Sequence, residues 1–240
     1  MIQSLLYGPP HFPEGITDVR QWISIIEEMN QTWEEVTKSS LHQLNISATL
    51  CLYYSYQKSP KARQAMKLFL SGLEVSAPRL SSPLGYVVSL SLFHFVIALH
   101  RLALDSPESK LKELIKALKQ AEKALRVLKE RWAFVIPIHS LAVGLKYWMK
   151  GSSKKALSTW RNALNKLDHI SDNLKFVKAI IQVRIVRCAQ GADALKMEAA
   201  EFLQRVGART ELAFLVGENF SPLPAIAEEE EEEVDVPGDE

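Results

Sequence analysis

Between residues 107 and 131, hydrophobic and polar positions alternate with the period of an amphipathic helix. Apolar residues recur at spacings of three and four, at Leu111, Leu114, Leu118, Ala121, Leu125 and Leu128. This spacing places them on a single helical face, and the intervening positions are mostly basic. The pattern predicts a long helix that buries one side and exposes the other.

Similar spacings elsewhere predict further helices, which group into pairs separated by short breaks. The pairs are 44–57 with 60–75, 84–104 with 107–131, 137–150 with 153–168, and 173–189 with 192–206, and an earlier helix begins near Thr17. Prolines mark several breaks, with Pro60 and Pro107 placed in first turns and Asp105 or Ser106 as a helix cap. Residues 134–138 and 178–188 are rich in β-branched residues, but no Asn-Gly or Asp-Gly turn adjoins them, so both are interpreted as helical.

These elements predict an all-α fold, a stack of antiparallel helix pairs. The predicted organisation is a flexible N-terminal segment at 1–16, a helical-repeat domain at 17–217 and a disordered acidic tail at 218–240. A run of six glutamates cannot bury enough apolar surface to fold alone, which is why the tail is expected to be disordered.

One predicted hairpin, at 137–168, has small and aromatic residues at a distinctive set of intervals. They are Gly144, Tyr147, Ala156, Trp160 and Ala163. This arrangement resembles the tetratricopeptide repeat, whose paired helices use small and aromatic residues at those intervals. Small residues at 144 and 156 would let the helices cross closely, with the two aromatic rings filling the space on either side.

The resemblance to that repeat is uneven along the chain. Asp168 stands where the family usually has proline, Leu50 replaces a small residue in an earlier pair, and the repeat length drifts between about 30 and 45 residues. The resemblance therefore implies a degenerate α-solenoid rather than a regular array.

A second resemblance concerns residues 198–215, where an alanine-rich helix is followed by a short Gly-Ala turn. This segment is similar to the closing hairpins of helical-repeat tails in large signalling ATPases and in soluble adenylyl cyclase. Residues 17–217 resemble the C-terminal region of the latter, which implies a non-catalytic part in cyclic AMP signalling. In that family the catalytic carboxylates lie in N-terminal domains, and no position here matches them.

The net charge of +1 conceals a strong asymmetry. Residues 218–240 contain ten acidic and no basic residues, so the remainder carries 29 basic and 18 acidic residues, a net charge of +11. Basic residues concentrate on the 107–131 helix, and the candidate surface for an acidic partner is Lys112, Lys116, Lys119, Lys123 and Arg126. Because of this asymmetry, the chain is better described as a basic body with an acidic tail than as a protein that is neutral throughout.

The basic helix admits several interpretations. It can be a solvated helix face, a surface for an acidic protein partner or for this chain's own tail, or a calmodulin-type target or nucleic-acid surface. The helix lacks interleaved aromatic residues, and the acidic tail would compete with phosphate, so nucleic acid is not expected as a partner.

The motif search predicts no catalytic residue, no cofactor and no metal site. Phosphate-binding loops, dinucleotide fingerprints and HExxH or GxSxG motifs are missing, and the six histidines lack metal-ligand spacing. Two isolated cysteines and a poor signal-peptide pattern at the N-terminus predict a cytoplasmic location without a membrane. Two alternatives stay open: an enzyme with an unrecognised helical active site, and a membrane anchor through the apolar run at 84–104.

Overall fold

The computed structural model describes residues 23–25, 27–28, 40–76, 85–167, 174–188 and 192–206, and within them the regular secondary structure is helical without a strand. The predicted all-α class is therefore confirmed for this part of the chain. The N-terminal segment 1–16, most of the first predicted helix, Asp168 and the acidic tail at 218–240 lie outside the described residues.

The helices follow the predicted pairs closely. They are α3 (Ser40–Tyr56), α4 (Lys61–Ser76), α5 (Gly85–Leu104), α6 (Glu108–Lys129), α7 (Val135–Met149), α8 (Ser153–Leu167), α9 (Lys175–Cys188) and α10 (Asp193–Arg205). Both segments rich in β-branched residues are helical, in α7 and α9. In α9 the buried residues run unbroken from Ala179 to Ile185, so burial on all sides outweighs the weak local preference for strand.

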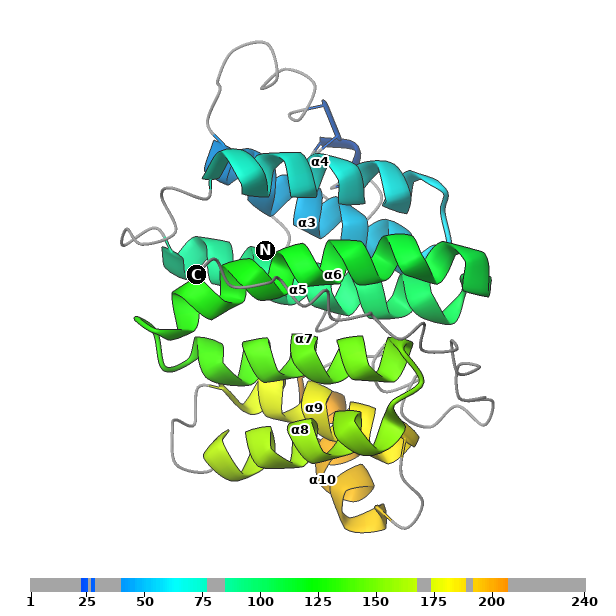
Figure 1. Cartoon of the computed structure of the whole chain (residues 1–240), viewed down its shortest axis with the longest axis vertical. Helices are drawn as coiled ribbons and strands as arrows, with labels where there is room; N and C mark the ends of the chain where they lie inside the picture. The colour runs from blue at the N-terminus through cyan, green and yellow to red at the C-terminus, as the bar shows by residue number, and fades with distance from the viewer. Residues whose placement is uncertain are drawn as a thin grey trace, which may run out of the picture.

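Contacts between helices follow chain order. Each odd-numbered helix from α3 to α9 packs against the even-numbered helix that follows it, and successive odd-numbered helices also touch. Figure 1 shows α3 and α4 toward one end of the long axis, α5 and α6 next, then α7, with α8, α9 and α10 toward the other end.

Polar bonds show that α4 and α6 run in the same direction. Arg63 pairs with Glu113 at 2.5 Å near the start of both helices, and Gln120 donates to Glu74 at 3.1 Å farther along both. The helices that follow α3 and α5 in the chain are therefore parallel to each other.

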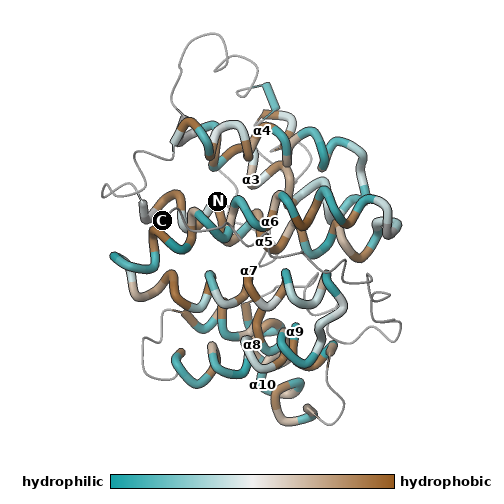
Figure 2. The backbone as a smooth tube through the Cα atoms, viewed as in Figure 1, coloured by the Kyte–Doolittle hydropathy of each residue, from teal (hydrophilic) through white to brown (hydrophobic). Residues whose placement is uncertain are grey.

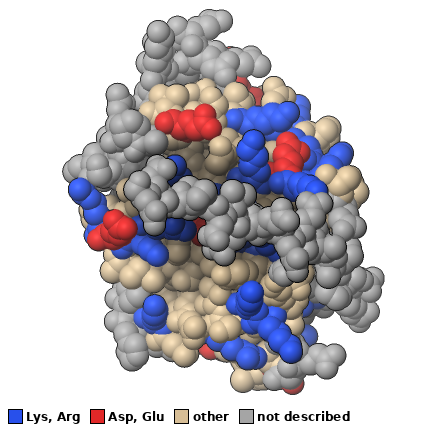
Figure 3. Space-filling model, viewed as in Figure 1, with Lys and Arg blue, Asp and Glu red and all other residues tan. Residues whose placement is uncertain are grey.

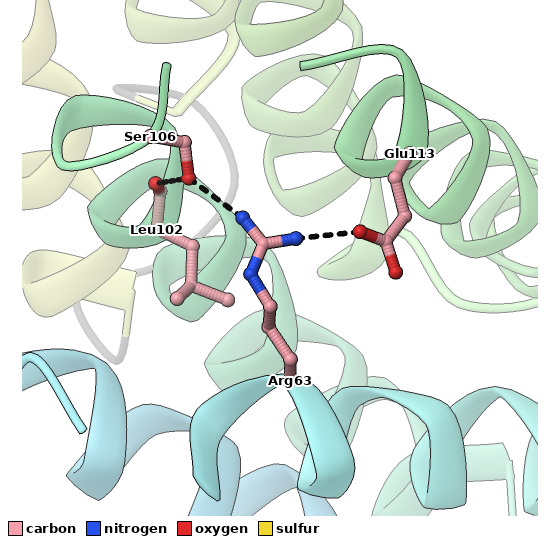
Figure 4. A network of polar contacts seen from close by, with 4 residues as sticks. All are labelled: Arg63, Leu102, Ser106 and Glu113. Atoms are coloured by element: carbon pink, nitrogen blue, oxygen red, sulfur yellow. Dashed lines mark hydrogen bonds and ion pairs between the residues drawn. The ribbon is translucent and has the colours of Figure 1, made fainter. Parts of the chain in front are cut away.

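The turn between α5 and α6 corrects one prediction. Pro107 is the N-cap residue of α6, and no side chain caps the helix, so neither Asp105 nor Ser106 has the predicted role. Instead the Ser106 hydroxyl donates to the Leu102 carbonyl oxygen at 2.6 Å and accepts a hydrogen bond from Arg63 at 2.9 Å (Figure 4). Asp105 forms an ion pair with a lysine of the α3–α4 turn. These polar contacts tie α4 to the turn that starts α6.

Burial divides the helices into two kinds. Even-numbered α6 and α8 alternate hydrophobic and hydrophilic residues along their length, as Figure 2 shows, because only one face of each is buried. By contrast, α5 and α9 are buried around most of their circumference. The outward faces of α6 and α8 are therefore among the surfaces on which this fold can present chemistry.

Helix α5 is the one helix of the described residues that is long and apolar enough to cross a membrane. Over Val87–Leu104 its mean hydropathy is 1.8, and 72% of that window is buried inside the protein. Core helices of soluble proteins have the same length and composition. The contacts of α5 with α3, α6 and α7 therefore offer another explanation for its apolar composition.

Candidate functional site: the basic face of α6

The rotation of α6 is set by its apolar residues. Leu111, Leu114, Leu118, Leu125 and Leu128 are all fully buried, and the helix packs against α5 and α7. Burial of leucine side chains stabilises the fold by about 1.5–3 kcal/mol each, so this orientation is strongly determined. The opposite side must then face outward.

On that outward side, the five predicted basic residues form a continuous row. Lys112, Lys116, Lys119, Lys123 and Arg126 are all exposed. Their spacings alternate between four and three residues, so at 100° per residue they fall within an arc of about 80°. At 1.5 Å per residue the row is about 21 Å long. We call these five residues the lysine row.

Two carboxylates of α6, those of Glu113 and Glu122, lie beside the row and have partners on other helices. Glu113 pairs with Arg63 of α4, and Glu122 pairs with Lys146 of α7 at 2.6 Å. Arg126 contacts Glu122 at 3.3 Å. The four lysines of the row form no ion pair with any described residue.

Such a row is not favoured by the stability of the helix itself. Like charges three or four residues apart destabilise a helix by about 0.2–0.5 kcal/mol per pair. Neighbours along the row stand at those spacings throughout. A negatively charged ligand lying along the helix would remove this repulsion.

Positive charge is concentrated in this part of the chain. Residues 108–167 contain fourteen basic and four acidic residues, a net charge of +10. Figure 3 shows basic side chains over the region of α4 and α6, with acidic side chains among them, and further basic side chains over α8. The potential over this face is therefore positive.

The basic residues of α8 are arranged differently from the lysine row. Lys154, Lys155, Arg161 and Lys166 are exposed, but they spread over an arc of about 140°, with serine and asparagine between them. They do not form a single line along the helix. For an extended acidic chain, α6 is the better match.

The hairpin of α7 and α8 brings its predicted residues into the core. Gly144, Ala156, Trp160 and Ala163 are buried, and Tyr147 is half-buried. The Trp160 indole lies directly on Gly144, since a Cβ atom built there would be 2.6 Å from Cε2 of the ring. The indole Nε1 donates to the Leu141 carbonyl oxygen at 3.3 Å. The Trp160 ring therefore leaves no room for a side chain at residue 144. This reason is more specific than the close helix crossing expected from the sequence.

A buried ion pair between α6 and α7 was missed by reasoning from the sequence. The side chains of Glu122 and Lys146 are only 8% and 20% exposed. The sequence carried a signal, because Glu122 falls four residues after Leu118 and three before Leu125, on the apolar face. His139 of α7 lies nearby, and burial, with Lys129 adding to it, lowers its pKa to about 4.

Two further histidines are buried in α5. Burial lowers the pKa of His94 to about 4 and, with Arg184, Arg101 and Arg187 contributing, lowers the pKa of His100 well below its usual value. Both side chains are therefore neutral at physiological pH. His94 is buried in the core, and its Nδ1 has no hydrogen-bond partner within the described residues.

The interior offers little space beside these groups. A narrow pocket has no room for a water molecule, and it is lined by Val96, Ile97, His100, Leu141, Leu145, Trp160 and Arg184. Burial raises the pKa of the Cys51 thiol to about 12 and that of Cys188 to about 11, so both thiols are protonated. Among the described residues, no group of three or more His, Cys, Asp or Glu side chains could hold a metal ion.

No family model matches this chain, and no curated protein or solved structure gives a match to it.

Proposed function

We propose that this chain is a helical-repeat module that binds an acidic protein partner through the lysine row of α6. The observation that carries the proposal is the row itself: five exposed cations in line, with no ion pair to the four lysines within the described residues. A row of this kind attracts an acidic segment over its whole length and steers its approach.

Support for the repeat interpretation comes from the order of helix contacts. Neighbouring odd-numbered helices touch, each packs on its following partner, and α4 and α6 run in parallel. Tetratricopeptide-like stacks use the same order, because each hairpin buries its apolar face on the next. Repeats of this type act mainly as binding surfaces.

A protein partner fits the row better than nucleic acid does. Proteins that bind single-stranded nucleic acid interleave aromatic side chains with basic ones, and α6 contains no aromatic residue. An acidic protein segment, by contrast, needs no aromatic side chains on α6, because its carboxylates can pair with the cations of the row.

The wider assignments stay predictions from the sequence. Of the segment 198–215 that resembles the end of a soluble adenylyl cyclase, the structure describes residues up to Val206. A part in cyclic AMP signalling belongs to the proposal on that resemblance alone, and a cytoplasmic location belongs to it on the isolated cysteines and the poor signal-peptide pattern.

The proposal is tested with two full-length variants of equal charge. In the row variant, Lys112, Lys116, Lys119 and Lys123 are replaced by glutamine, and in the control variant, four exposed lysines outside the row are replaced in the same way. The control positions are Lys67, Lys154, Lys155 and Lys166. Fluorescence anisotropy with a labelled decaglutamate peptide at 50 mM salt then compares their affinities.

We expect the row variant to bind the peptide at least tenfold more weakly than the control variant. Equal weakening of both would show that net charge alone attracts the peptide, and the proposal would be wrong. Circular dichroism of both variants checks that the helices are retained.

A further inference from the structure

We infer that the acidic run Glu228–Glu233 of this same chain occupies the lysine row when no partner is bound. The inference rests on the proposed function of the row and names its regulation: a partner has to displace the chain's own carboxylates. The acidic run lies outside the described residues, and its charge, its length and the reach of the connecting chain point to this contact.

Charge complementarity favours this occupant. Residues 218–240 hold ten carboxylates and no basic residue, while the row holds five cations without an intervening carboxylate on its line. The acidic run is covalently attached to the body that carries the row, so it is present at a fixed ratio. Tethering gives it an effective concentration that can reach the millimolar range.

The lengths also match. Six glutamates in an extended conformation cover about 20 Å, at about 3.4 Å per residue. The row covers about 21 Å along the α6 axis. An extended acidic run lying parallel to α6 would thus place carboxylates along the whole row.

The connecting chain is long enough for this contact. Helix α10 ends at Arg205, and 22 residues separate it from Glu228. Such a segment can span up to about 75 Å. Helix α10 contacts α9, α9 contacts α7, and α7 contacts α6, which Figure 1 shows near the middle of the molecule. The axes of packed helices lie about 8–10 Å apart, so these three steps add up to well under 75 Å.

The contact is expected to be readily displaced. Its charges are solvent-exposed, and at 0.15 M salt the screening length is about 8 Å. Occupancy of the row should therefore fall as salt rises, and a partner with apolar contacts in addition to its carboxylates can displace the acidic run.

Carbodiimide cross-linking of the full-length protein tests the contact directly. The reagent condenses a glutamate carboxylate with a lysine amine into an amide, and takes up the water lost as a urea. At 50 mM salt and high dilution, we expect amide links from residues 228–233 to Lys112, Lys116, Lys119 or Lys123, found by mass spectrometry in the monomer. Links to Lys154 and Lys155 on α8 serve as the control and should be at least fivefold rarer.

A second measurement uses the decaglutamate peptide and a tail variant, the full-length chain with Glu228→Gln through Glu233→Gln. With a peptide Kd of about 0.1 mM and an effective tail concentration of about 1 mM, the tail variant should bind about tenfold more tightly than the unmodified chain. This gain should disappear when Lys112, Lys116, Lys119 and Lys123 are also replaced by glutamine.

The outcomes separate this inference from the proposed function. Equal peptide affinity for the unmodified chain and the tail variant, or cross-links spread evenly over α6 and α8, overturns the inference. In that case the proposed function still stands if the row variant loses peptide binding. If the row variant keeps peptide binding, the proposed function fails, whatever the tail does.

Discussion

At the scale of single residues, the closest contact in the α7–α8 hairpin is that of Gly144 with the Trp160 indole. We predict that Gly144→Ala lowers the free energy of unfolding by about 1–2 kcal/mol. Overpacking typically costs about 1–3 kcal/mol, while alanine regains up to about 1 kcal/mol of helix propensity. Urea denaturation followed by tryptophan fluorescence measures the difference.

Ser158→Ala is the matched control for this change, since Ser158 is exposed on α8. Its free energy of unfolding should stay within about 0.5 kcal/mol of that of the parent protein. Equal midpoints for Gly144→Ala and Ser158→Ala would contradict the described contact between glycine and indole.

His94 makes stability depend on pH. Its folded pKa of about 4 lies below the usual 6.5, so the unfolded chain takes up a proton more readily than the folded one. The contribution of neutral His94 to the free energy of unfolding is fully present above about pH 6.5 and is lost as pH falls toward 4. Between pH 7 and pH 5 the loss should be about 2 kcal/mol.

The comparison of the parent protein with His94→Leu isolates that effect. Urea denaturation at pH 7, 6 and 5 should show the parent losing about 2 kcal/mol relative to the variant. His100 and His139 titrate in the same sense in both proteins and cancel. A constant difference between the two proteins across this range would exclude a lowered pKa at His94.

At the scale of helices, the buried pair of Glu122 and Lys146 joins α6 to α7. We predict that Lys146→Met costs about 3 kcal/mol, because it leaves a buried carboxylate without its closest cation. Replacing both residues, with Glu122→Leu added, should restore at least about 1 kcal/mol. A double-mutant cycle by chemical denaturation gives the coupling.

Arg205 and Glu201 on α10 provide the contrast, with side chains 69% and 75% exposed. Arg205→Ala should cost no more than about 0.5 kcal/mol, as exposed pairs on helices typically do. If the two pairs gave the same coupling energy, Glu122 would have to be more solvated than its burial indicates.

The lysine row should cost α6 some stability. Replacing Lys112, Lys116, Lys119 and Lys123 by glutamine removes four like-charge neighbour contacts of about 0.2–0.5 kcal/mol each. In the tail variant, where attraction to the acidic run is absent, we expect this to raise the free energy of unfolding by about 1 kcal/mol at 20 mM salt. The gain should vanish at 0.5 M salt, where charges are screened. A loss of stability at low salt would show that the lysines support the fold.

The helices themselves could be predicted from the sequence, because apolar spacing and proline-marked breaks are local signals. The exposed positions of the five residues of the lysine row could be predicted from the same spacing. Other features depend on contacts between distant segments. Ser106 bonds to Arg63 instead of capping α6, and Trp160 lies on Gly144; neither geometry is encoded in spacing alone. The spacing gave Glu122 no role, because its partner Lys146 is 24 residues away.

At the scale of the whole molecule, the helical fold separates a buried set of helices from an outward basic face. Helices α5 and α9 are enclosed, while α6 and α8 expose one side each. Residues 108–167 hold a net charge of +10, and residues 218–240 hold ten acids without a base. This distribution leads us to expect binding that is sensitive to salt and directed to acidic partners.

The central claim is that the lysine row binds an acidic protein, and affinity capture from a cell lysate tests it most directly. Three full-length baits are compared at physiological salt: the unmodified chain, the row variant and the control variant of equal charge. We predict that acidic proteins retained by the unmodified chain are also retained by the control variant and are lost from the row variant. Capture of the same proteins by the row variant and the control variant would contradict the claim.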